Sequence, residues 1–391
     1  MNWNHMGALF GWAGVALLLL SLALMVREPR LARALGGWET MLRWHHRAGM
    51  AGYLLLLAHP LALAWAVEQS QPAQGWARLA PAQQGWSVDA GWAALLVLMA
   101  GLLATFSPRL AYRPWRATHQ LLGLGVLAGL AHVAALRGHE GLALLAMAVA
   151  AGLLGWRIVV TDRGASALPY RVTQVAHPAG GAIEATLQPL AGALRPAPGQ
   201  FVAARFLDSL DYQACGEFHP FTVSGIGADG SLRLAIKALG ACSSRIQRIG
   251  PGVLVRLQGP FGSFLQQHAV SQPQLWVAGG IGITPFIAAL RQRPCAQPTA
   301  LVYVYRCEPE AAFLEELRLL QACTPRLQLI TQATGAAKAD LQGLLAQVEG
   351  LAQRQVHVCG PAALVDDLSP RLREQGVPAQ AIHVERFDFR S

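Results

Sequence analysis

Charged residues are scarce in this 391-residue chain. They make up 14% of it, against 53% hydrophobic residues, which excludes an ordinary soluble protein, where about a quarter of the residues are charged. The apolar residues are concentrated in the first 160 positions, and the remainder has the composition of a water-soluble α/β protein. We therefore expect a membrane half, residues 1–160, followed by a soluble half.

Cysteine is absent from the membrane half, and no two cysteines have C-x-x-C spacing. This argues against a zinc or iron–sulfur site, and scattered single cysteines fit a reducing compartment. An acid–base triad is not evident either. The cysteines are Cys215, Cys242, Cys295, Cys307, Cys323 and Cys359.

Lysine and arginine are also absent before the first long apolar run, which argues against a signal peptide. Five runs approach the ~20 residues needed to cross a bilayer, with ~17 tolerated. The last is short, but Arg157 at its end can extend its side chain to the membrane surface. We predict spans at 6–26, 48–67, 90–106, 117–136 and 141–156.

The net charge of +9 does not indicate nucleic-acid binding, because the arginines of the first half lie in short loops between apolar runs. Loops 27–47 and 107–116 carry eight arginines, whereas loops 68–89 and 137–140 carry two. Positively charged loops stay on the cytoplasmic side. We expect an integral protein of a bacterial-type inner (plasma) membrane, with its soluble half in the cytoplasm.

Two histidines lie on each of the second and fourth spans, which run in the same direction. His45 and His59 are ~21 Å apart along a helix and share a face, and His119 and His132 are ~20 Å apart. Across the bundle, His45 would face His119 and His59 would face His132. Each pair offers the two imidazoles of a six-coordinate haem.

Alternatives to this assignment remain open. Packing or interface histidines are possible, although ionisable residues inside a membrane segment are functional candidates by default. His46 is a rival to His45 as a ligand. Its 13-residue spacing points it away from the face of His59, so His45 is preferred.

The stretches RWHHRAGMAGYLLLLAHP and WRATHQLLGLGVLAGLAH resemble the ferric reductase-like transmembrane domain of ferric reductases and NADPH oxidases. The resemblance implies two b-type haems stacked across the membrane on four histidines. The sequence departs from many members in having five spans in place of six. The span it lacks would be the first, which does not touch the haem helices.

The soluble half divides into two patterns. From about 165 to 268, short β-rich runs separated by glycine and proline predict an antiparallel β-barrel. From about 273 to 391, strands alternate with helices, which predicts a doubly wound parallel sheet. The expected fold is therefore multi-domain: an α-helical transmembrane bundle, an antiparallel β-barrel and a doubly wound α/β domain.

Two strand ends of the α/β domain carry glycine and proline. Glycines let a phosphate approach backbone N–H groups, and a helix N-terminus favours negative charge. Both ends lie at the carboxyl edge of the sheet, where open α/β sheets bind ligands. The residues are Gly279, Gly280, Gly282, Thr284 and Pro285 after the first strand, and Cys359, Gly360 and Pro361 after the later one.

From about 165 to the C-terminus, these segments in this order resemble the ferredoxin–NADP reductase superfamily. The resemblance implies that FAD binds along HPFTVSG (219–225) and that its pyrophosphate meets LAIKALGACSS (234–244); GPFGSF (259–264) is also typical. The segment ACSS departs from the family pattern, which leaves Ser243 and Ser244 as alternatives. The implied flavin-site residues are His219, Pro220, Phe221, Thr222, Lys237, Gly240 and one of these two serines.

The same resemblance implies that Thr284 and Cys359 flank the nicotinamide, although Cys359 could be a small buried hydrophobic residue. Arg306 would meet the 2′-phosphate of NADPH or remain solvated, so NADPH is only mildly favoured over NADH. The chain ends in ERFDFRS. Phe389, or Phe387 as second choice, would stack on the flavin or close the sheet edge.

These features predict an NAD(P)H-dependent flavocytochrome b. A hydride would pass to FAD, and single electrons would cross from the haem of His45 and His119 to that of His59 and His132. The acceptor would be oxygen, a ferric chelate, or a partner protein or quinone. The outer loops lack a metal-ligand cluster, which favours oxygen over a chelate. No protein partner is identified, and a haem-free anchored flavin reductase is the remaining alternative.

Overall fold

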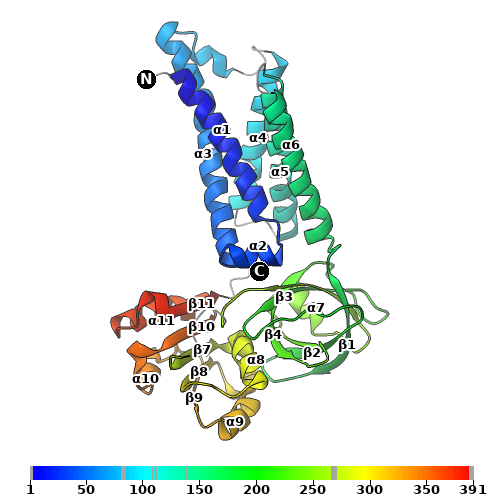
Figure 1. The fold of residues 1–391 in the computed structure, drawn as a ribbon, viewed down its shortest axis with the longest axis vertical. Coiled ribbons are helices and arrows are strands. Elements are labelled where there is room, and N and C mark those ends of the chain that lie inside the picture. The colour runs from blue at the N-terminus through cyan, green and yellow to red at the C-terminus, as the bar shows by residue number, and fades with distance from the viewer. Residues whose placement is uncertain are drawn as a thin grey trace. The chain divides into compact units, whose positions relative to one another are not determined.

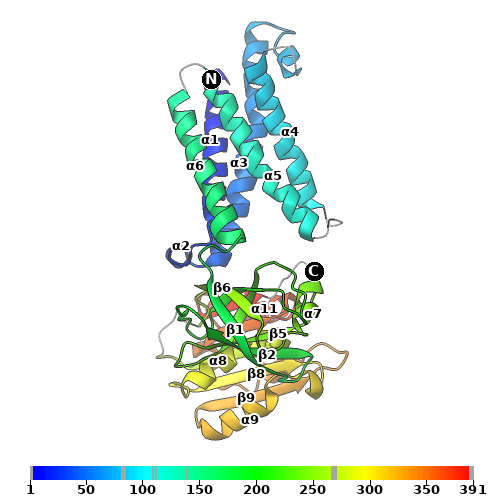
Figure 2. The same cartoon turned by 90° about the vertical axis from the view of Figure 1, so that its right-hand side faces the viewer.

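The structure is a computed structural model that describes residues 3–80, 85–107, 110, 112–136, 140–265 and 271–386. The chain folds as two compact units, residues 1–165 and 166–391 (Figures 1 and 2). The first is helical, and the second combines a β-barrel with an α/β domain. This architecture confirms the predicted fold class.

The first unit is a bundle of long helices (Figure 1). Within the described residues, five are long and apolar enough to cross a membrane, as the sequence predicts. A short helix, α2, follows the first of them. The helices are α1 (Trp3–Leu24), α2 (Pro29–Ala34), α3 (Trp38–Ser70), α4 (Trp86–Phe106), α5 (Tyr112–Ala134) and α6 (Glu140–Trp156).

The helices extend beyond the apolar runs seen in the sequence. The second long helix, α3, has 33 residues and begins at Trp38, so that His45 lies well inside it. The fifth span continues past Trp156 as a π-helical turn, Arg157–Asp162, and the apolar helical segment Glu140–Asp162 has 23 residues. The span that looked short is therefore long enough to cross a bilayer.

Asp162 forms ion pairs and a hydrogen bond with the polar side chains at this end of α6. Its carboxylate lies 3.0 Å from the Arg116 guanidinium of α5 and 3.2 Å from Arg157 Nε, and it accepts a hydrogen bond from Gln120. Arg157 also donates to the carbonyl of Met25, just past the end of α1 (3.2 Å). The charges and carbonyls at this end are therefore paired among three helices.

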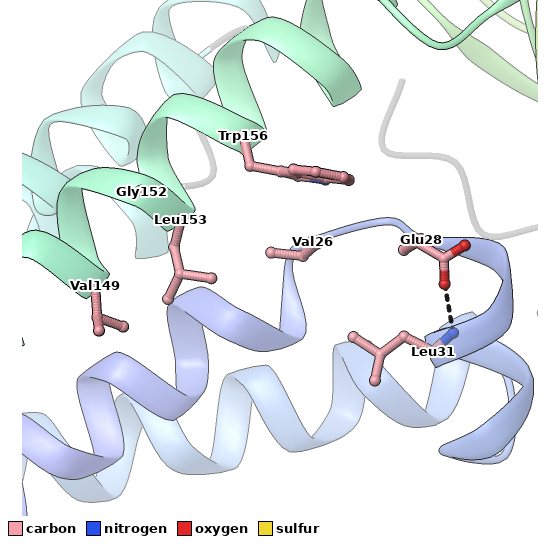
Figure 3. A pocket seen from close by; sticks show the side chains of 7 residues that line it. All are labelled: Val26, Glu28, Leu31, Val149, Gly152, Leu153 and Trp156. Carbon is pink, nitrogen blue, oxygen red and sulfur yellow. Dashed lines mark hydrogen bonds between the residues drawn. The ribbon is translucent and has the colours of Figure 1, made fainter.

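An open apolar groove lies beside the same helix ends (Figure 3). Glu28 closes one side and caps α2, because its carboxylate accepts from the Leu31 amide at 2.7 Å. None of the four predicted haem ligands is among the residues of the groove. They are Val26, Glu28, Leu31, Val149, Gly152, Leu153 and Trp156.

The second unit begins with a closed six-stranded antiparallel barrel, in the order β1-β2-β5-β4-β3-β6. Its interior is filled by aliphatic and aromatic side chains such as Tyr170, Leu187 and Leu234, which are fully buried. The short helix α7 (Ala241–Ile246) follows β5. The strands are β1 (Leu168–Ala176), β2 (Ala182–Pro189), β3 (Phe201–Phe206), β4 (His219–Ile226), β5 (Leu232–Lys237) and β6 (Leu254–Phe261).

The α/β domain contains a five-stranded parallel sheet in the order β11-β10-β7-β8-β9. Cys359 pairs in register with Ala278, so β10 and β7 end at the same edge. The strands are β7 (Gln274–Gly279), β8 (Thr299–Tyr305), β9 (Leu327–Ala333), β10 (Gln355–Gly360) and β11 (Ile382–Arg386). The helices are α8 (Thr284–Gln292), α9 (Leu314–Cys323), α10 (Leu341–Leu345) and α11 (Ala362–Glu374).

Arg291 on α8 joins the barrel to the α/β domain. Its guanidinium lies 2.6 Å from Glu184 of β2 and 2.7 Å from Glu316 of α9, and it donates to the Ser224 carbonyl of β4 at 2.9 Å. The Ser224 hydroxyl donates to Glu184 at 2.6 Å. Because the Arg291 and Glu184 side chains are only 14% and 7% exposed, solvent screens this pair little.

Replacing Arg291 by alanine should destabilise the second unit strongly, because the substitution leaves the Glu184 carboxylate buried without its positively charged partner. Breaking a buried pair in this way costs about 3–5 kcal/mol of unfolding free energy. Denaturation of the detergent-solubilised full chain measures the effect.

Arg318→Ala provides the matched control, because Arg318 pairs with Glu308 and Glu315 at the surface. Exposed pairs contribute little, so its unfolding midpoint should stay near that of the wild type. Equal losses in the two variants would show that the Arg291 cluster has no special role.

Candidate cofactor sites

The four predicted haem ligands face one another across the bundle. His45 and His59 lie on α3, and His119 and His132 lie on α5. The ring centroids of His45 and His119 are 6.0 Å apart, with the planes at 76°. His59 and His132 also lie near each other, on the same two helices. The structure therefore brings the histidines together in the two predicted pairs.

Helix α1 orients both histidines of α3. The Nδ1 atom of His45 lies 2.7 Å from the Ser21 hydroxyl and 3.0 Å from the Ser21 carbonyl oxygen. The Nδ1 atom of His59 lies 2.7 Å from the carbonyl oxygen of Gly7. Both contacts come from α1, which packs along α3 in the opposite direction.

Helix α4 does the same for α5. The Nδ1 atom of His119 lies 3.1 Å from the Thr105 hydroxyl, and that of His132 lies 2.5 Å from the carbonyl oxygen of Ser87. The Thr105 hydroxyl donates to the Gly101 carbonyl at 2.7 Å. It must therefore accept from His119, so that Nδ1 of His119 carries the proton.

These contacts give all four histidines the same tautomer. Nδ1 donates to an oxygen of the neighbouring helix, and Nε2 keeps its lone pair. Metal-binding histidines almost always donate their second ring nitrogen in this way. A metal between two imidazoles separates the ring centroids by about 6 Å, because each bond is ~2 Å and each centroid lies ~1 Å behind its nitrogen. The His45–His119 separation matches that value.

His46 occupies a different environment. Its side chain is exposed, and its ring centroid lies 5.5 Å from that of His45. By contrast, His45 is held by Ser21 and faces His119. Trp115 stacks on His119, with centroids 5.3 Å apart and planes at 8°. The geometry favours His45 as the ligand on α3.

Glycines lie against the second histidine pair. A Cβ at Gly11 would come within 3.1 Å of Nδ1 of His59, and one at Gly91 within 3.0 Å of Nδ1 of His132. Such distances are shorter than ordinary carbon contacts. Any side chain at position 11 or 91 would therefore crowd the ring of His59 or His132.

The segment assigned to flavin begins at β4. Thr222 is buried and Pro220 is exposed, and Phe221 is part-buried in an edge-to-face contact with Phe206 at 6.5 Å. His219 opens the strand, and its ring lies 6.5 Å from that of Phe221. Pro220 and part of Phe221 are thus accessible to a planar ligand.

The segment assigned to pyrophosphate lies at the end of β5 and the start of α7. Lys237 Nζ lies 3.7 Å from Glu310. The Ser243 hydroxyl accepts from the Leu239 and Gly240 amides, each at 2.9 Å, and Ser244 is exposed. Ser243 therefore shapes the turn itself, which leaves the exposed Ser244 as the more accessible hydroxyl.

A thiol cluster adjoins His219. The Cys215 Sγ atom lies 3.4 Å from His219 Nε2. Burial by itself raises the pKa of Cys215, but hydrogen bonds with His219 and Cys242 lower it to about 7. Burial, followed by the charges of Cys215 and Cys242, raises the pKa of Tyr212 to about 12. These groups lie beside the predicted flavin segment.

The glycines after β7 have two different roles. A Cβ at Gly282 would come within 2.1 Å of the Cys359 carbonyl oxygen, and one at Gly279 within 2.9 Å of the Pro361 ring. Gly280 has φ +54° and nothing within 4 Å of its Cβ position. Gly279 and Gly282 therefore permit the two loops to pack, and Gly280 borders open space where a phosphate could approach.

The remaining residues predicted for the nucleotide site lie at or near the same edge. Thr284 and Pro285 begin α8 and are buried, and Cys359 at the end of β10 is fully buried. Gly360 packs against the backbone of Gly279. Arg306 follows β8, which pairs with β7, and is exposed.

Phe387 and Phe389, predicted to stack on the flavin, lie outside the described residues. The residues that orient the histidines, above all Ser21 and Thr105, were not among those predicted from the sequence. Each is a hydroxyl within an otherwise apolar span. That feature could have marked them, because a polar group inside a membrane must find a partner.

Comparisons with known proteins match both units. Residues 10–130 match the family model of the ferric reductase like transmembrane component, and residues 276–369 match the oxidoreductase NAD-binding domain. A ferredoxin–NADP reductase B from Sorangium cellulosum is 32% identical over 181 residues, 41% of this chain and 74% of that protein.

Two further similarities come from a curated relative and a solved structure. The reductase component of naphthalene 1,2-dioxygenase/salicylate 5-hydroxylase systems from a Ralstonia species is 26% identical over 51% of this chain, which spans 62% of that protein's length. A flavohemoglobin structure from Malassezia yamatoensis has a TM-score of 0.52 at 16% identity and covers 99% of each chain. At that identity the likeness shows fold alone.

The fold and these matches define an oxidoreductase that joins a transmembrane electron-transfer component to a pyridine-nucleotide module. The chain belongs to the ferredoxin–NADP reductase family through its second unit, and its first unit is a ferric reductase-like transmembrane domain.

Substituting Gly282 by alanine should damage the nucleotide domain, because the added methyl group would meet the Cys359 carbonyl at 2.1 Å. Backbone atoms cannot yield cheaply, so we expect a loss near the upper end of the ~1–3 kcal/mol range for overpacking. Thermal denaturation and NAD(P)H oxidation by the purified protein measure it. Gly250→Ala, which has nothing within 4 Å, should leave both unchanged, and equal damage there would contradict the packing argument.

Proposed function

We propose that this protein carries electrons from cytoplasmic NAD(P)H, through FAD and two b-type haems, to an acceptor on the opposite side of the membrane. The proposal rests above all on the four histidines whose Nδ1 atoms are held by α1 and α4. Four available Nε2 atoms in two pairs meet the ligand requirement of two six-coordinate haems.

The second unit supplies the entry point for electrons. FAD, when bound, converts hydride transfer from NAD(P)H into single-electron steps. Pro220 and Phe221 would support its ring system, and Lys237 would neutralise its pyrophosphate. The Lys237–Glu310 pair is part-exposed and 3.7 Å long. Such pairs are weak, so Lys237 can exchange the carboxylate for a phosphate.

The nucleotide would bind at the edge formed by β7, β8 and β10. The open space beside Gly280 suits its pyrophosphate, and the exposed Arg306 suits a 2′-phosphate, which favours NADPH. Thr284 and Cys359 would flank the nicotinamide. Phe389 or Phe387 would cover the flavin ring.

The arginine-rich loops support a cytoplasmic second unit in a bacterial-type inner (plasma) membrane. Oxygen is the first candidate acceptor, because the loops of the opposite side carry no metal-ligand cluster in the sequence. Reduction of ferric chelates is the alternative that the transmembrane family model suggests.

A second candidate function is electron donation to a partner protein or a quinone. The supporting observation is that curated relatives of the second unit are named as reductase components of oxygenase systems. The similarity of these relatives covers about half of this chain. It therefore bears on how electrons enter from the nucleotide and does not identify the acceptor.

Removing His119 should eliminate one haem of the two. His119→Ala deletes one ligand of the first pair, so the reduced-minus-oxidised b-type absorbance per protein should fall by about half. His45→Ala should give the same loss. Spectroscopy of the detergent-purified protein measures both.

His46→Ala is the matched control, because it changes the neighbouring histidine on the same helix. It should keep the full absorbance. If the His46 variant loses haem and the His45 variant keeps it, the ligand assignment is wrong. Retention of all b-type bands after alanine replaces the four histidines would eliminate the haem proposal.

Arg306→Ala should discriminate between the two nicotinamide cofactors. Loss of a charge-assisted bond to the 2′-phosphate should raise KM for NADPH about tenfold and leave KM for NADH unchanged. Steady-state kinetics with a soluble dye as electron acceptor measure both constants. Equal effects on the two cofactors would place Arg306 outside the 2′-phosphate site.

The acceptor is best tested in proteoliposomes with the second unit facing outward and NADPH added outside. Oxygen, a ferric chelate and a quinone are supplied in turn. Superoxide trapped inside, detected as cytochrome c reduction that superoxide dismutase abolishes, is the expected result. Preferential reduction of the enclosed ferric chelate or of the quinone would select that acceptor and contradict the oxygen assignment.

A further inference from the structure

The thiol cluster joins three segments of the barrel that are apart in sequence. Cys215 lies in the loop before β4, His219 is the first residue of β4, and Cys242 lies in the first turn of α7. Their ligand atoms, two sulfurs and one imidazole nitrogen, all lie within 4.8 Å of one another. All three side chains are part-buried, so the cluster is accessible to a small ion.

The spacing of these atoms suits a tetrahedral metal. With a metal–sulfur bond of ~2.3 Å and a metal–nitrogen bond of ~2.0 Å at a tetrahedral angle, neighbouring sulfur and nitrogen ligands lie about 3.5 Å apart. The Cys215 Sγ–His219 Nε2 distance is 3.4 Å. An ion could therefore be bound with a small adjustment of these side chains.

A buried hydroxyl nearby gives independent support. Tyr212 is 5% exposed, and its hydroxyl has no hydrogen-bond partner within the described part of the chain. Both cysteines act on it electrostatically, so it lies near the cluster. Buried polar groups normally have a partner, and water on a fourth metal position would provide one.

We propose that Cys215, His219 and Cys242 form a site for a thiophilic divalent cation, Zn²⁺ in the first place. Two cysteines and one histidine with a fourth position open to water are an established type of zinc ligand set. The ion would tie the loop before β4 to α7. This inference rests on the geometry of the barrel, and it assigns to the metal a residue, His219, that the family resemblance placed along the flavin.

Zinc binding by the full-length protein tests the site directly. The protein is purified in detergent without an affinity tag, stripped of metal and kept reduced, and Zn²⁺ is titrated against a chromogenic chelator. We expect one Zn²⁺ per chain that is lost in Cys215→Ser and Cys242→Ser, with affinity at least tenfold lower. Cys323→Ser is the matched control, because that cysteine is exposed on α9, and should bind as the wild type does.

Co²⁺ provides a second readout, because thiolate ligation produces charge-transfer absorption that histidines alone do not. We expect these bands in the wild type and in the Cys323 variant. Equal zinc affinity in all variants, or Co²⁺ binding without thiolate bands, would overturn the proposal.

A test on the unmodified chain covers the case in which a serine variant does not fold. Zn²⁺ should slow alkylation of Cys215 and Cys242, measured by mass spectrometry of peptides, and should leave Cys323 unprotected. It should also raise the unfolding temperature, because binding to the native state stabilises it. Alkylation of Cys215 and Cys242 that Zn²⁺ leaves unchanged would contradict the site.

Discussion

Hydrogen bonding of imidazole inside an apolar bundle is the constraint on which the membrane unit depends. A polar group in hydrocarbon needs a partner from the protein. The bundle provides one by dividing into two antiparallel pairs, α1 with α3 and α4 with α5, and in each pair one helix supplies the oxygens and the other the histidines. The facing edges of α3 and α5 then hold the imidazoles, and the proposed haem sites depend on this packing.

The second unit depends on a different constraint. The β7 and β10 loops must pack closely at one edge of the sheet, and the barrel must be joined to that sheet. Close approach of the β7 and β10 loops requires glycine at positions 279, 282 and 360. The buried Arg291 cluster fixes α8, which begins at that edge, to strands β2 and β4 of the barrel. The domain that would receive the nucleotide is thus joined to the one that would hold the flavin by bidentate charge-assisted bonds, which are strong and directional.

The sequence predicted much of this arrangement because its signals are periodic. Apolar runs gave five spans, and helical spacing gave the pairing of His45 with His119. Contacts between segments that are distant in the sequence could not be predicted in this way. Ser21 and Thr105 act through helix packing that no local pattern encodes, and Cys215 and Cys242 come together only because the barrel closes, so C-x-x-C spacing could not reveal them. Gly282, predicted as a nucleotide-site residue, also allows two loops to pack, which no local pattern indicates.

The two histidine pairs differ in the origin of their supporting oxygens. Side-chain hydroxyls contribute at His45 and His119, whereas main-chain carbonyls alone hold His59 and His132 in the contacts described. A point mutation can remove a hydroxyl but cannot remove a carbonyl. A single substitution can therefore change the hydrogen bonds of the first pair one residue at a time. The hydrogen bonds of the second pair end on backbone atoms, so a substitution can alter them only by shifting the helices against one another.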